Sequence, residues 1–144
     1  MEVKELIELE EQHYRDGNWE SLGKLYTEDT EFTSADGSVI RGRDAVIAYA
    51  RREAEAFTDN ALTQELVAVD GDTAVVLWSW SGTHSKDLVA PSGQKLPATG
   101  TRVSIDAVSI CTISDGRISS ARRYHDRLGM MLALGIVRLP GGGA

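Results

Sequence analysis

The chain has 144 residues, of which 42% are hydrophobic and 26% are charged, a composition typical of a globular protein with one core. Its formal net charge is −7, and because nucleic acids and anionic membrane surfaces are bound by clustered positive charge, neither is an expected partner. No apolar stretch approaches the ~18 residues that cross a membrane. The single cysteine, Cys111, excludes an internal disulfide and favours a reducing compartment, so we expect a cytoplasmic protein.

The first part of the chain has mainly helical periodicity. Apolar residues recur among many glutamates near the start, which predicts an amphipathic helix whose acidic first turns suit the helix dipole. Asp16-Gly17-Asn18 ends this helix, and Arg43-Asp44 opens another. The predicted elements of this part are helices over 3–14, 19–26 and 43–57 and a short strand over 30–34.

From residue 60 onward the periodicity changes to that of strands. Asp70-Gly71-Asp72 and Asp115-Gly116 are hairpin turns, because glycine accepts the positive φ that tight turns need. The predicted strands cover 62–69, 73–84, 100–113 and 117–127, with a loop over 85–97. Helices segregated from an antiparallel meander define the α+β class. We expect one domain over 1–140, with a flexible tail at 141–144, built as a curved antiparallel sheet around three helices that encloses a cavity.

The last predicted strand carries the first candidate site. Arg122, Tyr124 and Asp126 share parity, so all three point to the same side of the sheet, whereas His125 is expected to face away. If that side is concave, a guanidinium, a phenol and a carboxylate meet in one pocket that suits acid–base chemistry on a small organic molecule. If that side faces solvent, the three residues belong to an ordinary solvent-exposed sheet face. The alternation alone leaves both interpretations open.

The long middle strand carries the second candidate site. Trp78, Trp80 and His84 share one face of it, and two tryptophans on a face suit stacking on a flat polycyclic ligand, although packing under the helices would explain them equally. Tyr14 fits the core, in a position from which its hydroxyl can point inward. The histidines have no ligand-like spacing and no cysteine cluster accompanies them, so we expect no metal site.

Several segments resemble the SnoaL-like polyketide cyclases and ester cyclases of the nuclear transport factor 2-like superfamily. They are Gly42-Arg43-Asp44-Ala45-Val46, Ser81-Gly82-Thr83-His84-Ser85, Leu96-Pro97-Ala98-Thr99-Gly100-Thr101-Arg102-Val103 and Asp115-Gly116-Arg117-Ile118 followed by Asp126. The resemblance implies a cone-shaped α+β barrel in which Asp126 acts as general acid and base in an aldol-type ring closure, without metal or cofactor. It also implies a homodimer formed through the outer sheet face, where we expect Ala107, Cys111 and Ala121.

We therefore expect a cofactor-independent lyase or isomerase that acts on a hydrophobic, carbonyl-bearing, polyketide-like molecule. Asp126 is its expected catalytic residue, and the expected substrate-binding residues are Arg122, Tyr124, Trp78, Trp80, His84 and Tyr14. Arg122 is open to a substrate contact or to an ion pair with Asp126. A non-catalytic binding protein that uses the same cavity is the main alternative.

Two enzyme branches with the same fold are further alternatives. An epoxide hydrolase fits the Arg122 and Asp126 ending, but the middle strand Leu77–Ser81 lacks the Arg-x-Asp of that branch. Ketosteroid-isomerase-like enzymes place their base after the first short strand. Asp36 occupies that place here, in a turn that we expect to be exposed to solvent.

Overall fold

The computed structural model describes residues 2–141, so the last three residues of the expected tail lie outside the described part. Its helices are α1 (Val3–Asp16), α2 (Trp19–Gly23), α3 (Arg43–Ala56) and α4 (Arg127–Ala133). Its strands are β1 (Tyr26–Thr33), β2 (Val39–Arg41), β3 (Phe57–Asp70), β4 (Thr73–His84), β5 (Leu88–Val89), β6 (Lys95–Leu96), β7 (Arg102–Ser114) and β8 (Arg117–His125). Within residues 2–141, none of the helices has the length and apolar character needed to span a membrane.

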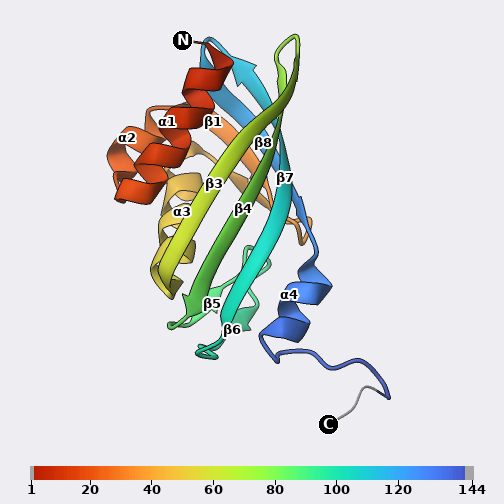
Figure 1. Ribbon diagram of the computed structural model, residues 1–144. Coiled ribbons are helices and arrows are strands. Elements are labelled where there is room, and N and C mark those ends of the chain that lie inside the picture. Colours follow the sequence, from red (N-terminus) through yellow and green to blue (C-terminus); the bar gives the residue numbers. More distant parts are fainter. Residues whose placement is uncertain (1, 142–144) are drawn as a thin grey trace.

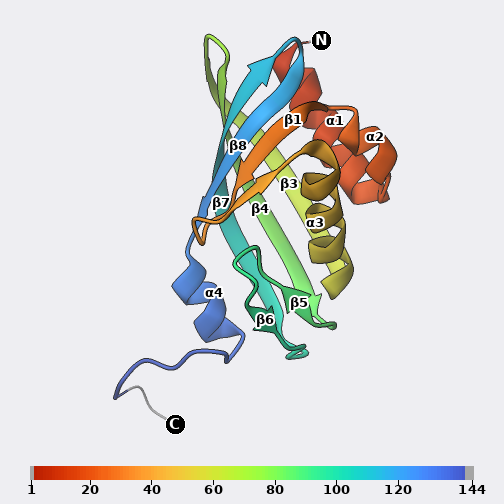
Figure 2. The same cartoon turned by 180° about the vertical axis from the view of Figure 1, so that it is seen from behind.

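The main sheet has six strands in the order β2-β1-β8-β7-β4-β3. All neighbours are antiparallel except β1 and β8, which run parallel, with Phe32 opposite Ala121. Helices α1 to α3 lie along one side of the curved sheet, and α4 lies with the β5–β6 hairpin at the end opposite the β3–β4 turn (Figures 1 and 2). The predicted α+β class and curved sheet are confirmed, with a fourth helix and one parallel pair as additions.

The helices that cover the sheet bury narrow apolar stripes. Helix α1 buries Leu6 and Ile7, and it ends where Gly17 adopts a left-handed backbone with φ 67°, which glycine accepts without a Cβ clash. Helix α3 buries Val46 and Tyr49 on the side that faces the sheet. These two helices therefore close the concave side of the sheet and bring their inward-facing polar residues to it.

Strand β4 alternates along its whole length, as its sequence predicted. Its even-numbered residues are buried, including Val76, Trp78, Trp80 and His84, while Leu77 on the opposite face is exposed. This strict alternation follows from the two-residue period of a strand with one face on the core. The inward orientation of both tryptophans is therefore built into the sequence of β4.

Strand β8 contains a bulge that reverses its parity. Thr112 of β7 lies opposite Ser120, but the next residue, Ile113, lies opposite Ile118, so Ser119 is the extra residue. A bulge of this kind shifts every following side chain to the other face. Ile118 points into the core, but beyond Ser119 the inward positions are odd-numbered.

The segment predicted as a loop over 85–97 contains a small hairpin. Strands β5 and β6 pair antiparallel, with Leu88 opposite Leu96, and both leucines are buried. The turn between them points toward the β1–β2 turn, where the backbone N–H of Ser92 donates to Asp36 Oδ2 at 3.2 Å (Figure 2). This hairpin supplies the wall of the cavity that the main sheet leaves open.

Candidate functional site

The cone encloses a largely apolar cavity with two compartments. The outer compartment opens between α4 and the β5–β6 hairpin, and its walls include Phe57, Leu96, Ile105 and Met131. The second compartment, called the inner one here, lies under α1 and the middle of the sheet. Four side chains line both compartments and lie where the two meet: Glu53, Trp78, Trp80 and Arg123.

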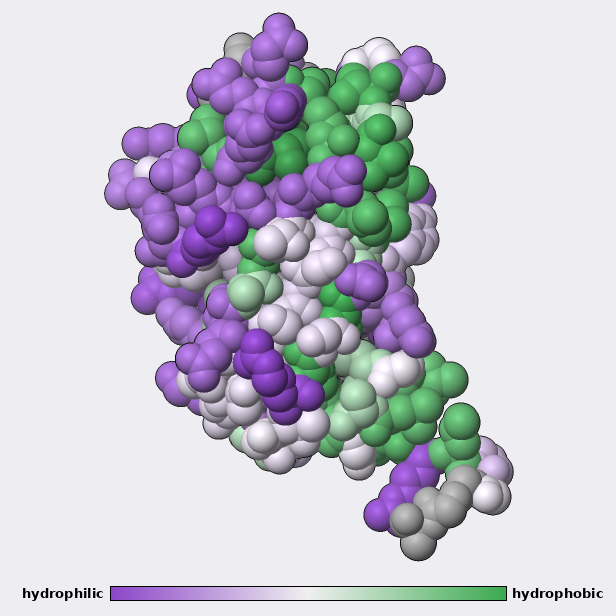
Figure 3. All heavy atoms as spheres, in the orientation of Figure 1, coloured by the Kyte–Doolittle hydropathy of each residue, from purple (hydrophilic) through white to green (hydrophobic). Residues whose placement is uncertain are grey.

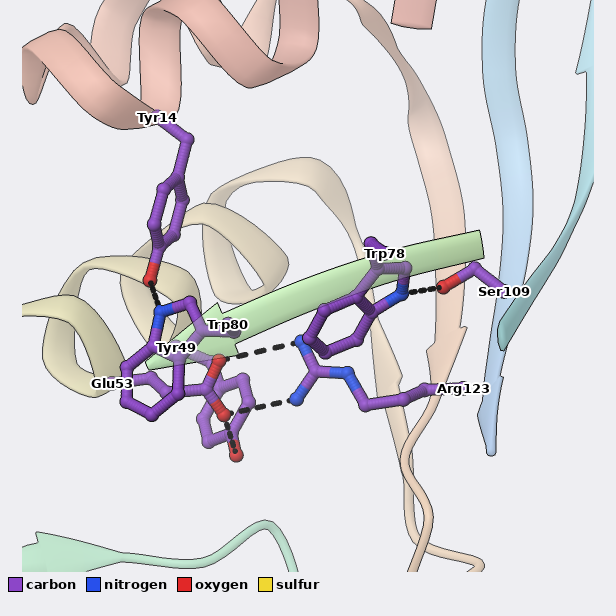
Figure 4. A network of polar contacts seen from close by, with 7 residues as sticks. All are labelled: Tyr14, Tyr49, Glu53, Trp78, Trp80, Ser109 and Arg123. Carbon is purple, nitrogen blue, oxygen red and sulfur yellow. Dashed lines mark hydrogen bonds and ion pairs between the residues drawn. The ribbon is translucent and has the colours of Figure 1, made fainter. Parts of the chain in front are cut away.

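A buried ion pair lies where the compartments meet, and Figure 4 shows its hydrogen bonds. Arg123 of β8 donates through Nη1 to Glu53 Oε2 at 2.9 Å and through Nη2 to Oε1 at 3.3 Å. The hydroxyl of Tyr49 donates to Glu53 Oε2 at 3.0 Å, one helical turn away on α3. Only 17% of the Arg123 side chain and 19% of that of Glu53 are exposed, so the pair is held in the protein interior. A two-pronged contact of this kind fixes the guanidinium in one orientation.

Two aromatic rings lie close to the guanidinium of Arg123. Its Cζ lies 4.9 Å from the ring centroid of Phe32 and 5.1 Å from that of Trp78, within the range of cation–π attraction. Although burial disfavours the charged form, the Glu53 carboxylate raises the pKa of Arg123 above its ordinary value. Its Nε is buried and has no hydrogen-bond partner among the described residues. Arg123 is therefore a permanent cation with one N–H donor left over at the cavity wall.

His125 stands two residues further along the same face of β8, in the outer compartment. Its Nδ1 is buried and also lacks a hydrogen-bond partner within residues 2–141. Burial lowers the pKa of His125, and the positive charge of Arg123 lowers it further. The imidazole is therefore neutral at pH 7 and able to accept a proton.

The inner compartment contains a second set of polar groups. Glu10 of α1 accepts hydrogen bonds from the hydroxyl of Tyr26 and, at 3.1 Å, from Nε2 of Gln64. Burial raises the pKa of Glu10, against the opposing effect of these two hydrogen bonds. Tyr14 accepts a hydrogen bond from Nε1 of Trp80 at 3.2 Å, and burial raises the pKa of its hydroxyl, which therefore stays protonated (Figure 4).

The structure brings together three of the predicted site residues. Trp78 and Trp80 line both compartments and Tyr14 lines the inner one, with its hydroxyl pointing inward. The prediction that Arg122 and Tyr124 line the cavity is wrong, because both are exposed on the convex face of the sheet. The bulge at Ser119 is the physical reason, since it exchanges the faces that odd and even residues occupy.

Asp126 lies at the end of β8 and begins helix α4. Its Oδ1 accepts a hydrogen bond from the backbone N–H of Gly129 at 2.8 Å, which caps the helix. The carboxylate is exposed and lies outside the residues that line the two compartments, although its neighbours His125 and Arg127 belong to the outer one. The expected cavity position is therefore wrong, and among the described residues no ion pair joins Asp126 to Arg122. Its catalytic role stays a prediction.

His84 and Asp36 lie elsewhere than the sequence suggested. His84 is fully buried behind the cavity wall, where its ring stacks on Phe57 with the centroids 4.9 Å apart. Asp36 is half-buried at the mouth of the outer compartment, so the expectation of a solvent-exposed turn is wrong. It accepts hydrogen bonds from the backbone N–H groups of Ser38 and Ser92, and these bonds outweigh burial and lower its pKa. Asp36 therefore holds the β5–β6 hairpin and is a weak base.

The sequence interpretation missed Glu53 and Arg123, and it placed His125 on the wrong face. Glu53 follows Tyr49 by four residues on α3, so a shared helix face was visible in the sequence. Nothing local indicated that this face meets β8. Among residues 2–141, no three His, Cys, Asp or Glu side chains are grouped so that they could hold a metal ion.

The outer face of the sheet differs from expectation as well. Ala107 and Cys111 are buried and Ala121 is half-buried, and all three point to the concave side. The exposed apolar residues of the main sheet are instead on β2, β3, β4, β7 and β8 and include Val39, Val67, Val69, Leu77, Ile110 and Tyr124. Figure 3 shows apolar side chains gathered over the part of the sheet next to the β3–β4 turn.

Comparison with known proteins gives a family and a common fold. The family model of the SnoaL-like domain matches residues 7–121 of the sequence. A candidate SnoaL-like polyketide cyclase from Jannaschia sp. CCS1 is 21% identical, with a TM-score of 0.79 over 93% of this chain and 92% of that one. TsrD from Streptomyces laurentii is 27% identical, with a TM-score of 0.79 over 94% of this chain and 96% of that one. TerC, co-crystallised with polyporic acid, is 17% identical, with a TM-score of 0.72 over 91% of this chain and 96% of that one. None of the curated proteins matches the chain significantly.

Proposed function

Because the chain belongs to the SnoaL-like family, we propose that it is a cofactor-independent acid–base enzyme for a hydrophobic, carbonyl-bearing small molecule. One observation carries this proposal. Arg123 Nε and His125 Nδ1 are unpartnered polar atoms on neighbouring inward positions of β8, in a largely apolar cavity. Buried polar groups are normally hydrogen-bonded, so a bound ligand would supply what these two lack.

The two residues fit the two halves of an enolisation. The neutral imidazole of His125 takes a proton from the carbon next to a substrate carbonyl, and negative charge develops on the carbonyl oxygen. The N–H at Nε of Arg123 donates to that oxygen in a site from which water is largely excluded. The enolate carbon then attacks a second carbonyl of the same molecule, the new C–C bond closes a ring, and the alkoxide formed takes up the proton. This sequence is the aldol-type cyclisation that the resemblance implies.

The walls of the cavity fit flat, apolar substrates. Trp78 and Trp80 present ring surfaces to both compartments, and Phe57 meets Trp80 edge to face with the centroids 4.6 Å apart. Small molecules also occupy relatives of the same fold, since TerC was co-crystallised with polyporic acid and another relative is in complex with trimethylamine. A polycyclic ketone or polyketide is therefore the substrate class that we propose.

The proposal is tested by proton exchange on a model ketone. We expect the protein to accelerate deuterium incorporation at C1 of 2-tetralone in D₂O, followed by proton NMR. Because only the neutral imidazole accepts a proton, the rate should rise with pH and level off above a midpoint lower than the ordinary histidine value of 6.5. Saturable binding of 2-tetralone without any exchange above buffer would instead favour the alternative of a non-catalytic binding protein.

We also propose a homodimer formed through the convex face of the sheet. Leu77, Val108 and Tyr124 lie opposite one another across β4, β7 and β8, and Ile110 adjoins them. Leu77, Ile110 and Tyr124 are 41%, 39% and 52% exposed, which is a large apolar surface to leave in water. We expect light scattering to give about twice the 15.6 kDa chain mass at micromolar concentration and Leu77→Lys to return it to one chain mass. A single chain mass for the unsubstituted protein would contradict the proposal.

A further inference from the structure

Two polar side chains of helix α1 face the inner compartment side by side. Glu10 and Tyr14 are four residues apart, so they lie on the same helix face about one turn from each other. Both line the inner compartment, together with Tyr26, Gln64 and the shared wall of tryptophans. The enolisation proposed above uses neither of them. The half-buried carboxyl of Glu10 and phenol of Tyr14 therefore line this compartment without an assigned role.

Glu10 can accept further hydrogen bonds, and the hydroxyl of Tyr14 can still donate one. The carboxyl of Glu10 accepts one bond at each oxygen, from Tyr26 and from Gln64, and a carboxylate has about four acceptor positions. The oxygen of Tyr14 accepts from Trp80, and no acceptor for the Tyr14 proton is present among residues 2–141. The compartment thus offers one acceptor and one donor about a helical turn apart.

A ligand hydroxyl on a flat ring matches this pair, because a hydroxyl donates one hydrogen bond and accepts others. We propose that the inner compartment is a subsite for a phenol or enol hydroxyl, which donates to the carboxyl of Glu10 and accepts from the hydroxyl of Tyr14. The subsite rests on the proposed function in that the same substrate would fill both compartments. Because Trp78 and Trp80 line both of them, a flat molecule lying along these rings would present one end to His125 and the other to Glu10.

The neighbouring groups favour a hydroxyl over a carboxylate at this end. A ligand carboxylate would meet the carboxyl of Glu10 and the phenols of Tyr14 and Tyr26, in a compartment whose nearest cation, Arg123, is already paired with Glu53. A neutral hydroxyl adds no charge to the buried site, and an aromatic ring is accommodated by the apolar side chains Leu22, Leu62 and Val76 of the same compartment.

The test compares two probes of similar shape, 2-naphthol and 2-methylnaphthalene, in equilibrium dialysis. The methyl compound can neither donate to Glu10 nor accept from Tyr14, so we expect the protein to bind 2-naphthol about tenfold more tightly. Tyr14→Phe and Glu10→Gln should each reduce this preference to within about twofold. Their matched controls, Tyr124→Phe on the convex face and Glu8→Gln on the exposed side of α1, should keep it.

The outcomes separate this subsite from the catalytic proposal. A hydroxyl preference that survives both Tyr14→Phe and Glu10→Gln, or no preference in the unsubstituted protein, overturns the subsite. If a thermal scan shows that Glu10→Gln is unfolded, Tyr14→Phe alone tests the subsite, since it removes one oxygen and keeps the ring. Exchange of 2-tetralone without any hydroxyl preference would leave the proposed function standing and reject the subsite. A hydroxyl preference that depends on Tyr14, without any exchange of 2-tetralone, would support the subsite and reject the proposed function.

Discussion

Replacing Arg123 by Gln should lower the free energy of unfolding by about 3–5 kcal/mol. The physical reason is that the Glu53 carboxylate would stay buried with Tyr49 as its remaining side-chain donor. The same substitution removes the guanidinium that two aromatic rings hold. Urea unfolding followed by circular dichroism measures the loss directly. Arg123→Lys should lose less, because it keeps the charge but not the two-pronged contact.

The neighbouring arginine provides a matched control. Arg122 precedes Arg123 by one residue but is exposed on the convex face, so Arg122→Gln should change the free energy of unfolding by no more than about 0.5 kcal/mol. A loss below about 1 kcal/mol for Arg123→Gln, or equal losses for the two variants, would mean that the ion pair with Glu53 does not stabilise the fold. The double variant Glu53→Gln, Arg123→Gln should recover part of the loss, because it leaves no unpaired charge in the cavity.

Replacing His125 by Phe should slow the exchange of 2-tetralone by about 10²–10⁴-fold. Phenylalanine keeps a flat ring in the outer compartment but has no nitrogen to accept a proton, so binding of the ketone should change much less than the rate. The measurement is the initial rate of deuterium incorporation at saturating ketone, with the dissociation constant determined in parallel.

Asp126→Asn, compared with His125→Phe, decides which of the two residues is the base. The resemblance assigns the base to Asp126, whereas the unpartnered nitrogen inside the cavity belongs to His125. The amide keeps the oxygen that caps α4, so the fold should tolerate it. We expect Asp126→Asn to retain exchange within about threefold. Loss of exchange in Asp126→Asn, with exchange retained in His125→Phe, would return the role to the carboxylate.

The strands and the orientation of β4 were predictable because each depends on local patterns. Period-two alternation places Trp78 and Trp80 on one face whatever packs against them, and glycine turns mark the hairpins. Strand β8 shows the limit of this reasoning. Ile118 points into the core, but the extra residue Ser119 reverses the faces beyond it. The alternation of the sequence through Arg122 carries no trace of that reversal.

The candidate site was not predictable for a different reason. Glu53 lies on α3 and Arg123 on β8, 70 residues apart in the chain, and they meet because both elements pack against β1. A contact of this kind depends on the arrangement of the whole sheet, and no local pattern indicates it. The helix face shared by Tyr49 and Glu53 was readable, whereas its partner required the topology.

The parallel pairing of β1 with β8 has a consequence for the order in which the protein folds. The β3–β4 and β7–β8 hairpins join residues close in sequence and can form early, whereas Phe32 must find Ala121 across most of the chain. Closing so long a loop has a high entropic cost and is slow. We therefore expect the meander of β3, β4, β7 and β8 to assemble first. During synthesis, the segment from α1 to β1 would therefore keep an exposed apolar face until β8 has left the ribosome and can pair with β1.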